Sequence, residues 1–471
     1  MRINGRVATA IPCAGLLLLL LAAAGPRAQE AAPLLTLREA VLVALAGNER
    51  MLGSREAIEQ ARLGRTLAES AFGIRITPNV LGSFGQSDVR NQTYGVGASK
   101  RFATGTEFRM DVGASTFRNQ IGSFYAADTT LLVSQSLLRG FGPDVGRRQI
   151  ERAGHQVASA ERQHVLAEQQ LAIDVAATYY RLIAQRELAR AARAAVGNAR
   201  QLLAASEAKL QANLVSQLDV FRARQLVAEA ESQLFDVEGA GEDLEDQLRF
   251  FMDRDVDYEF CVAAAVDARV EALAPEVAVA TALENRVELR DADAAVDQAE
   301  RDVGYARRQL LPQVDVSFAL TRRETADDLR SAFGIDRFEP VTFISASTPL
   351  DRTAEVVAVR TAAIERNRRV RARDTLRRRI AQEARRALRL QQRLANRLDN
   401  AEVTVEFAER ETELADLRFQ RGLSNNLDVV NAQAALLNAT TRRLAVLADL
   451  AVARLALRAT LGTLDVRADL R

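Results

Sequence analysis

The sequence predicts a mainly helical protein whose strands enter a membrane, built from one unit that occurs twice. Three observations support this fold class. Residues 146–211 and 351–421 contain no proline, and at 1.5 Å per residue each stretch could form a helix of roughly 100 Å. A turn motif recurs at a fixed distance along the chain. Short, partly alternating segments precede both long stretches, and the chain begins with a secretory leader.

The first 28 residues have the three parts of a signal peptide. Arg2 and Arg6 precede an apolar run over residues 16–24, and small residues follow. This pattern predicts cleavage near Ala24 or Ala28. No later stretch reaches the roughly 20 apolar residues that a spanning helix needs, so we expect any membrane-spanning part of the mature chain to consist of strands.

Composition argues against several classes of function. The 63 basic and 62 acidic residues give a net charge of +1 and are interleaved, so we expect no nucleic-acid partner. Cys13 precedes the apolar run, which disfavours lipid attachment and leaves Cys261 as the only mature cysteine, without a disulfide partner. His155 and His164 lack companions at metal-ligand spacing. With no nucleophile elbow, phosphate loop or Cys/His pair, we expect no enzyme activity, metal or cofactor.

The duplication is clearest at two turns. Residues 213–220 align with residues 422–429, and both segments end in Leu-Asp-Val, at an offset of 428 − 219 = 209. Leu248 meets Leu457 at the same offset. The segments that begin at Pro78 and Pro312 also resemble each other. Each half therefore reads helix, strand, strand, long helix, tight turn, returning helix.

The first half carries more strand material than the second. It opens with a capping box, Thr36 and Glu39. Between its two aligned strands lies a hairpin candidate from Tyr94 to Ala114 that turns at residues 103–105. In the corresponding place the second half has only a charged loop, near residues 322–337.

The long stretches show a coiled-coil rhythm. In the second stretch, apolar or small residues recur in steps of four and three: Leu394, Leu398, Ala401, Val405, Ala408, Thr412, Ala415 and Phe419. This spacing predicts a heptad seam, and the first stretch repeats it from Leu188 to Leu202. A rod of this length cannot be the core of a compact domain, so it must be a stalk, a coiled coil or the wall of a tube.

The strands favour the tube. A lone hairpin is barely stable in water, and strands cross lipid only in a closed barrel, where every backbone group is paired. The four aligned strands of one chain are too few to close, so several copies would have to share one barrel. A secreted coiled-coil stalk or adaptor that never inserts in the membrane is the alternative; it explains the heptads and the leader but not the strands.

The ordered set of motifs resembles the TolC family of outer-membrane efflux and secretion channels. The resemblance rests on Leu35-Thr36-Leu37-Arg38-Glu39-Ala40, on Ser134-Gln135-Ser136-Leu137-Leu138-Arg139-Gly140 and on the two Leu-Asp-Val turns. It implies a homotrimer with a shared 12-stranded β-barrel in outer-membrane lipid and a 12-helix α-barrel in the periplasm. It also implies a duct for tripartite efflux or type I secretion that docks to a periplasmic adaptor and an inner-membrane transporter. Nothing in the sequence identifies the cargo.

The predicted boundaries follow the family pattern. Residues 1–28 are the leader. The first repeat covers 29–250, with strands at about 77–137 and coiled helices at about 146–250. An equatorial linker covers 251–282. The second repeat covers 283–463, with strands at about 312–348 and coiled helices at about 351–463, and residues 464–471 form a tail.

The two turns are the predicted tips of the tube. Asn213 and Gly422 stand where a helix ends in a left-handed residue. By resemblance, adaptor docking involves both residues together with Leu214, Val215 and Leu423. A hydrophobic contact that closes the helix end is an equally good interpretation of the leucines, and the two are compatible.

Two aspartates carry the gate hypothesis. Ser216 and Asn425 could cap the returning helices, with Asp219 and Asp428 completing capping boxes at the third helical position. By resemblance, Asp428 matches a carboxylate that faces the lumen, where three copies would form a cation-binding ring. Asp219 matches an acidic residue that links neighbouring coils in the closed state.

Three positions depart from the TolC pattern. Asn431 replaces a second ring aspartate, so we expect a weaker charge ring. Ser424 and Phe419 replace an arginine and a tyrosine that bond to the partner coil. We therefore expect the closed state to be held differently or only loosely here. The arginine-dense stretch at residues 366–389 fits a solvated helix face better than an anion-attracting wall.

Overall fold

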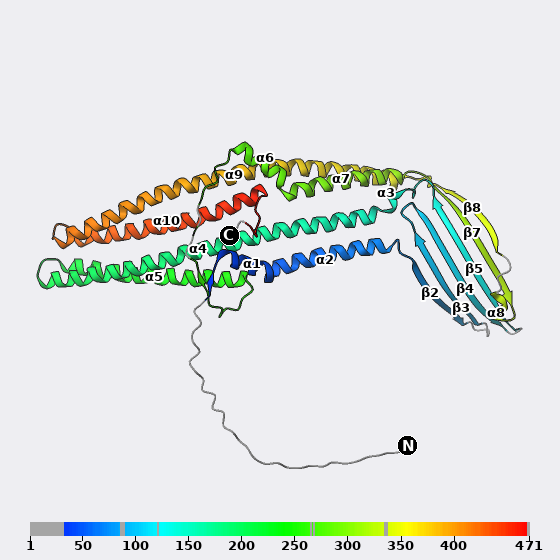
Figure 1. The fold of residues 1–471 in the computed structure, drawn as a ribbon, viewed down its shortest axis with the longest axis horizontal. Helices are drawn as coiled ribbons and strands as arrows, with labels where there is room; N and C mark the ends of the chain where they lie inside the picture. Colours follow the sequence, from blue (N-terminus) through cyan, green and yellow to red (C-terminus); the bar gives the residue numbers. More distant parts are fainter. Residues whose placement is uncertain are drawn as a thin grey trace, which may run out of the picture.

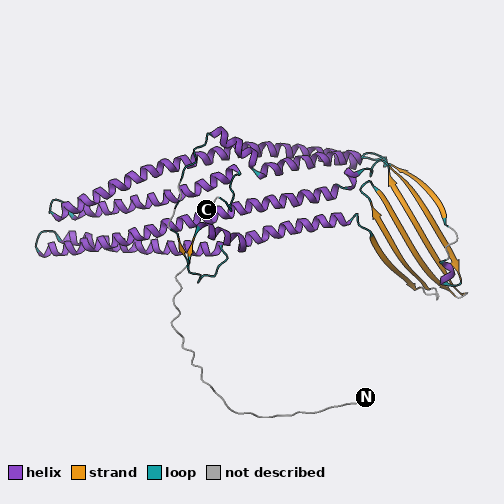
Figure 2. Ribbon diagram, viewed as in Figure 1, coloured by secondary structure: helices purple, strands orange, loops and turns teal. Residues whose placement is uncertain are grey.

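The computed structural model describes residues 33–468, apart from 85–89, 120–121, 264–265, 267–268 and 334–337. The predicted leader, including Cys13, lies outside the described residues. The molecule is elongated, with a sheet at one end and two helical hairpins at the other (Figure 1). Helices form most of its length and strands form only the sheet end and a short equatorial pair (Figure 2).

Four helices form the two hairpins. The first pair is α4 (Arg148–Gln211) and α5 (Gln217–Phe251), and the second is α9 (Thr353–Gln420) and α10 (Asn426–Leu461). With 64 and 68 residues, α4 and α9 are each roughly 100 Å long, which confirms the predicted rods. The two turns lie at the same end of the molecule, away from the sheet (Figure 1).

The predicted seam is the buried face of these helices. Leu394, Ala408, Thr412, Ala415 and Phe419 are buried in α9, and the other predicted seam positions are partly buried. In the first hairpin, Leu188, Ala192, Ala199 and Leu202 of α4 are likewise buried, and Ala195 is partly buried. Small side chains on both seams allow close helix approach, so the heptad prediction is confirmed.

Shorter helices complete the bundle toward the sheet. They are α1 (Leu37–Gly47), α2 (Glu49–Ser70), α3 (Pro143–Gly146), α6 (Pro275–Asn285) and α7 (Val287–Arg308). Helix α2 packs along α4, and α7 packs along α9. Thr36 and Glu39 form the predicted capping box at the start of α1. Among the described residues, no helix combines the length and the apolarity that a membrane-crossing helix requires.

The sheet is antiparallel, and its order is β2-β3-β4-β5-β7-β8. Its strands are β2 (Arg75–Phe84), β3 (Arg90–Arg101), β4 (Thr106–Asn119), β5 (Gly122–Ser136), β7 (Gln313–Ala326) and β8 (Glu339–Ser347). The short helix α8 (Leu329–Ala332) lies between β7 and β8 in the chain. Within the described sheet, β2 and β8 are the two edge strands.

Two expectations about the strands need correction. A 12-stranded barrel shared by three copies implies four strands from each chain, but the described sheet has six. The cause is the hairpin β3–β4, which lies inside the sheet between β2 and β5. The expected charged loop near residues 322–337 is also partly strand, because β7 continues through Arg322 to Ala326 and pairs there with β5.

The two faces of the sheet differ in polarity. Paired residues across all six strands form an apolar row: Ile76, Ala98, Met110, Leu131, Leu320 and Pro340. The next residue along each strand points to the opposite face, and that row is polar or glycine: Thr77, Gly97, Asp111, Thr130, Thr321 and Glu339. Ile76 is 66% exposed, so the apolar face has no covering layer within the chain.

The main core lies at the equator, between hairpins and sheet. The strand β1 (Leu34–Leu35) pairs in parallel with β6 (Cys261–Val262), which comes from the predicted linker. Tyr179 of α4 fastens this pair, since its hydroxyl donates to the carbonyl oxygen of Leu35 at 2.9 Å. Burial raises the pKa of this phenol.

Candidate functional site at the helix tips

Both tips end in the same backbone motif. Asn213 and Gly422 have φ values of 56° and 71°, the left-handed conformation expected from sequence. After α4, the N–H of Leu214 donates to Lys209 O at 2.9 Å, and the N–H of Asn213 donates to Leu210 O. The equivalent bonds follow α9, where Leu423 donates to Arg418 O at 2.8 Å. These are Schellman motifs, which give both turns the same fixed shape.

The apolar residues after each turn point into solvent. Leu214 and Leu423 are both 73% exposed, and Val215 is partly buried. Side chains this exposed make few contacts with their own helix. A hydrophobic contact that closes the helix end therefore does not explain why leucine stands at these two positions. The tips therefore display two exposed leucines in matching positions on two turns of the same motif.

Asp219 is engaged by its own helix. Its backbone N–H donates to the Ser216 hydroxyl oxygen at 3.3 Å, and its carboxylate accepts from the Ser216 N–H at 3.0 Å. The capping box predicted from sequence is therefore confirmed. Arg222 lies 3.9 Å from the same carboxylate. With its carboxylate engaged in these contacts, Asp219 has little capacity left to link coils through its side chain.

Asp428 is held differently, and its capping box is only half formed. The Asn425 side chain accepts from the Asp428 N–H at 3.1 Å, as expected. The carboxylate of Asp428 does not return to the cap but accepts from the Ser424 hydroxyl at 2.5 Å. The residue is exposed, and so is Asn431, one helical turn further along α10. Ser424 thus orients the carboxylate that the sequence marks as the ring candidate.

A lysine contacts Phe419 across the two hairpins. The Lys209 ammonium, near the end of α4, donates to Phe419 O at 2.5 Å and lies 3.6 Å from the centroid of the phenylalanine ring. Phe419 is only 5% exposed. A cation over an aromatic face is worth about 0.5–2 kcal/mol, and the hydrogen bond adds to it.

Asn426 makes a second connection between the hairpins. Its side-chain amide donates to Asp219 O at 2.7 Å and reaches Ser206 Oγ at 3.4 Å, and the residue is 1% exposed. The main chain at Asp219 therefore takes part in a link between coils, although its carboxylate does not.

Sequence reasoning missed Lys209 and Asn426. Lys209 did carry a signal, because it is one of two lysines in a chain whose other basic residues are arginine. An ammonium is a compact charge that fits over one ring and onto one carbonyl. Asn426 carried no such signal, since its partner is a backbone oxygen 207 residues away.

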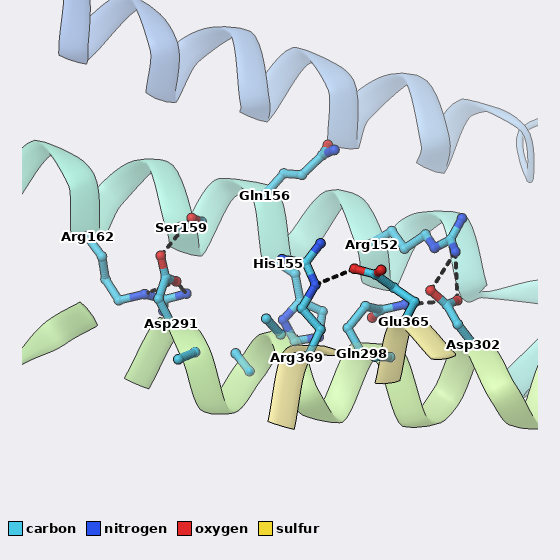
Figure 3. A pocket seen from close by; sticks show the side chains of 14 residues that line it. Arg152, His155, Gln156, Ser159, Arg162, Asp291, Gln298, Asp302, Glu365 and Arg369 are labelled. Atoms are coloured by element: carbon cyan, nitrogen blue, oxygen red, sulfur yellow. Dashed lines mark hydrogen bonds and ion pairs between the residues drawn. The ribbon is translucent and has the colours of Figure 1, made fainter. Parts of the chain in front are cut away.

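A polar groove between α4, α7 and α9 is explained by ion pairs (Figure 3). Arg152 binds both carboxylate oxygens of Asp302 at 2.7 Å, and Arg162 and Ser159 hold Asp291. Burial would raise the pKa of Asp302, but the guanidinium groups of Arg152 and Arg148 outweigh it and hold the pKa below 3.8. The groove therefore joins helices rather than presenting free acids. No group of three or more potential metal ligands occurs among the described residues.

One constellation resembles a catalytic triad. Ser54 Oγ lies 2.7 Å from His164 Nδ1, and His164 Nε2 lies 3.4 Å from Glu168. However, the Ser54 hydroxyl donates to Met51 O at 2.8 Å, in the manner of a helical serine. A serine whose proton is committed to its own helix is a packing contact between α2 and α4.

Comparison with known proteins identifies the second half of the chain. The family model described as outer membrane efflux protein matches residues 278–463, from α6 to the end of α10. The second repeat is thus similar to outer membrane efflux proteins. No curated protein sequence matches the chain.

Solved structures extend the efflux-protein fold to nearly the whole chain. The outer membrane protein VceC of Vibrio cholerae is 18% identical, with a TM-score of 0.70 over 90% of this chain and 96% of VceC. CusC is 16% identical, with a TM-score of 0.71 over 91% of this chain and 92% of CusC. The CmeC outer membrane channel of Campylobacter jejuni is 16% identical, with a TM-score of 0.68 over 92% of this chain and 87% of CmeC.

These matches confirm the resemblance to TolC-type channels that the sequence motifs indicated. In this fold, the sheet and the helix tips are the two ends of one elongated chain (Figure 1). The tips of this chain combine exposed leucines on two Schellman turns with one exposed aspartate and two links between the hairpins.

Proposed function

We propose that this chain is one of three subunits of an outer-membrane duct that serves a tripartite efflux or type I secretion system. The observation that carries the proposal is a six-stranded sheet with one exposed apolar face, joined to helices of roughly 100 Å. The apolar face suits lipid and the polar face suits a water-filled lumen. The helices would extend from the membrane into the periplasm.

Copies of the chain are needed because the sheet has two open edges. Strands in lipid must pair every backbone group, which only closure provides. A homotrimer in which the sheets join edge to edge meets this requirement. The long helices would then line a tube that continues the barrel.

The gate belongs to the tips in this proposal. Three copies of Asp428, each oriented by Ser424, would form a ring that attracts cations. Lys209 with Phe419, and Asn426 with the Asp219 backbone, would hold the two hairpins of each subunit together in the closed state. These two contacts would replace the bonds to the partner coil that the TolC pattern makes through an arginine and a tyrosine, where this chain has Ser424 and Phe419.

The tips are also the proposed adaptor surface. Leu214 and Leu423 project from turns of the same shape, with Asn213, Val215 and Gly422 beside them. The duplication presents two similar contact sites per subunit, so a trimer would offer six. Adaptor helical hairpins with apolar ends fit such sites.

Single-channel recording of the purified mature protein in a planar lipid bilayer tests the duct. We expect discrete conductance steps and block by a trivalent cation such as hexamminecobalt(III). Asp428→Ala should abolish the block, and Asn431→Asp should strengthen it by adding a second ring. An unchanged block in Asp428→Ala would contradict the ring hypothesis.

The same preparation tests the duct against a stalk. No conductance from folded trimers, either wild-type or with the closed-state contact removed by Lys209→Met, would overturn the duct proposal. Extraction from cells without detergent would instead support a secreted coiled-coil stalk.

A further inference from the structure

The hairpin β3–β4 is an insertion in one copy of the duplicated unit. Helices α2 and α7 both have 22 residues and are offset by 287 − 49 = 238, whereas the ends of α4 and α9 are offset by 420 − 211 = 209. The first half is therefore 238 − 209 = 29 residues longer between these points. The hairpin from Arg90 to Asn119 has 119 − 90 + 1 = 30 residues, which matches the difference to within one residue.

The inserted hairpin is an integral part of the sheet. It pairs with β2 over the full length of β2 on one side and with β5 on the other. Its glycines accommodate side chains of adjacent strands: a Cβ on Gly95 would lie 2.4 Å from Asn79 Oδ1, and one on Gly113 would lie 2.9 Å from Asp128 Oδ1. Such close fits on both flanks distinguish built-in strands from an appended loop.

The turn of the hairpin is fastened to the helical part. The N–H of Gly142 donates to Thr104 O at 3.1 Å. A Cβ on Gly146 would lie 2.2 Å from Ala103 O, so the turn approaches α3 as closely as only glycine permits. The extra strands are therefore anchored at the helix–sheet junction through the backbone of their turn.

We infer that three copies of this chain close a barrel of 18 strands, with the β8 edge of each copy paired to the β2 edge of the next. The inference rests on the proposed trimer. A barrel of 18 strands gives the membrane segment a wide, polar lumen suited to bulky hydrophilic solutes or polypeptides. Barrels of 16–18 strands leave an aqueous channel.

Geometry favours this count. Strands about 4.8 Å apart and tilted by about 40° give 18 strands a circumference of about 110 Å, whereas twelve strands give about 75 Å. Twelve helices spaced about 10 Å apart have a circumference of about 120 Å. The wider barrel thus continues the helical tube with little change in diameter, so solutes that pass the tube are not stopped at the membrane.

Electron cryomicroscopy of the full mature protein in lipid nanodiscs tests the inference by counting strands. We expect 18 strands in a trimer, and 12 in a variant that lacks residues 90–119, where β2 and β5 become neighbours. A trimeric wild-type channel with 12 strands and the hairpin outside the barrel would overturn this inference and leave the proposed function intact. Absence of trimers or of membrane insertion would overturn the proposed function itself.

Cross-linking gives a second readout that does not need the deletion variant to fold. In a Cys261→Ser background, Asn79→Cys on β2 and Phe343→Cys on β8 place thiols on the polar face of the two edge strands. A short bis-maleimide should produce covalent trimers from the double variant and only monomers from each single variant. If the double variant is trimeric but the reagent yields only monomers, the β8–β2 junction is contradicted.

Discussion

Asp219 and Asp428 occupy equivalent places in the two repeats but make different contacts. The Asp219 carboxylate closes a capping box with Ser216, whereas the Asp428 carboxylate accepts from Ser424 and is exposed. The two equivalent positions have therefore diverged: the Asp219 carboxylate caps its own helix, whereas the Asp428 carboxylate is exposed to solvent. The side chains of Lys209 and Asn426, and not the two aspartate carboxylates, connect the two hairpins.

Removing the Lys209 charge should loosen the closed tip. Lys209→Met keeps most of the apolar stem but removes the ammonium from Phe419, a loss of about 1–2 kcal/mol. We expect an open probability up to roughly tenfold higher in single-channel recordings, since 1.4 kcal/mol corresponds to a factor of ten. Lys100→Met removes the other lysine, which lies on β3, and should leave gating unchanged. Equal gating in wild type and Lys209→Met would exclude this contact as a latch.

Asp302 should make the junction of α4 and α7 sensitive to acid. Its pKa is lower in the folded chain than its ordinary value of 3.8, so the ionised form stabilises the fold above that value. This stabilisation is lost as the pH falls from 3.8 through the folded pKa. The thermal unfolding temperature of wild type should exceed that of Asp302→Asn at pH 6, and the gap should close in strong acid.

Asp297 provides the control for this comparison. It is exposed on the same helix, so Asp297→Asn should unfold close to the wild-type temperature at both pH values. A gap between wild type and Asp302→Asn that persists unchanged below pH 3 would mean that lost packing, rather than charge, explains the difference.

At the scale of elements, helices were predictable and strands less so. Proline-free length and the heptad rhythm fixed the two rods and their buried seam, because those signals are local and repeated many times. The hairpin β3–β4 was recognised as strands, but its place inside the sheet was not. Pairing partners are set by contacts distant in sequence, and β5 pairs with β7 from the other repeat.

The junction between hairpin and helix should be intolerant of a single methyl group. Gly146→Ala places Cβ against Ala103 O, and we expect a loss of about 1–3 kcal/mol as the turn is displaced. Gly154→Ala is the matched control, because nothing lies within 4 Å of its Cβ position and alanine favours a helix interior. Thermal unfolding in detergent should rank Gly154→Ala at or above wild type and Gly146→Ala below it. The reverse order would contradict the close docking.

At the scale of the whole molecule, the duplication gives two similar tips and one asymmetric sheet. The tips share backbone geometry down to the Schellman bonds. The sheet takes four strands from the first repeat and two from the second. The residue types at the turns predicted the conformation of the tips correctly. The roles of the tip residues stay proposals, because they depend on neighbouring copies and partners that one chain does not contain.

Replacing both tip leucines should uncouple export from channel formation. Leu214→Ser with Leu423→Ser removes the exposed apolar contacts without touching the turns. We expect normal trimers and normal conductance, but a severalfold loss of export in cells that carry the adaptor and the pump. Leu390→Ser, an exposed leucine far from the tips on α9, should export normally. Full export by the double variant would exclude the leucines from docking.

The equatorial core also has a consequence for how the protein is made. Leu35 and Leu464 belong to the same buried cluster although 464 − 35 = 429 residues separate them. The helical hairpins are local and can form early, but this cluster can close only when nearly the entire chain is available for folding. Until then the apolar strands have no finished scaffold, so we expect them to be the most aggregation-prone part of the folding chain.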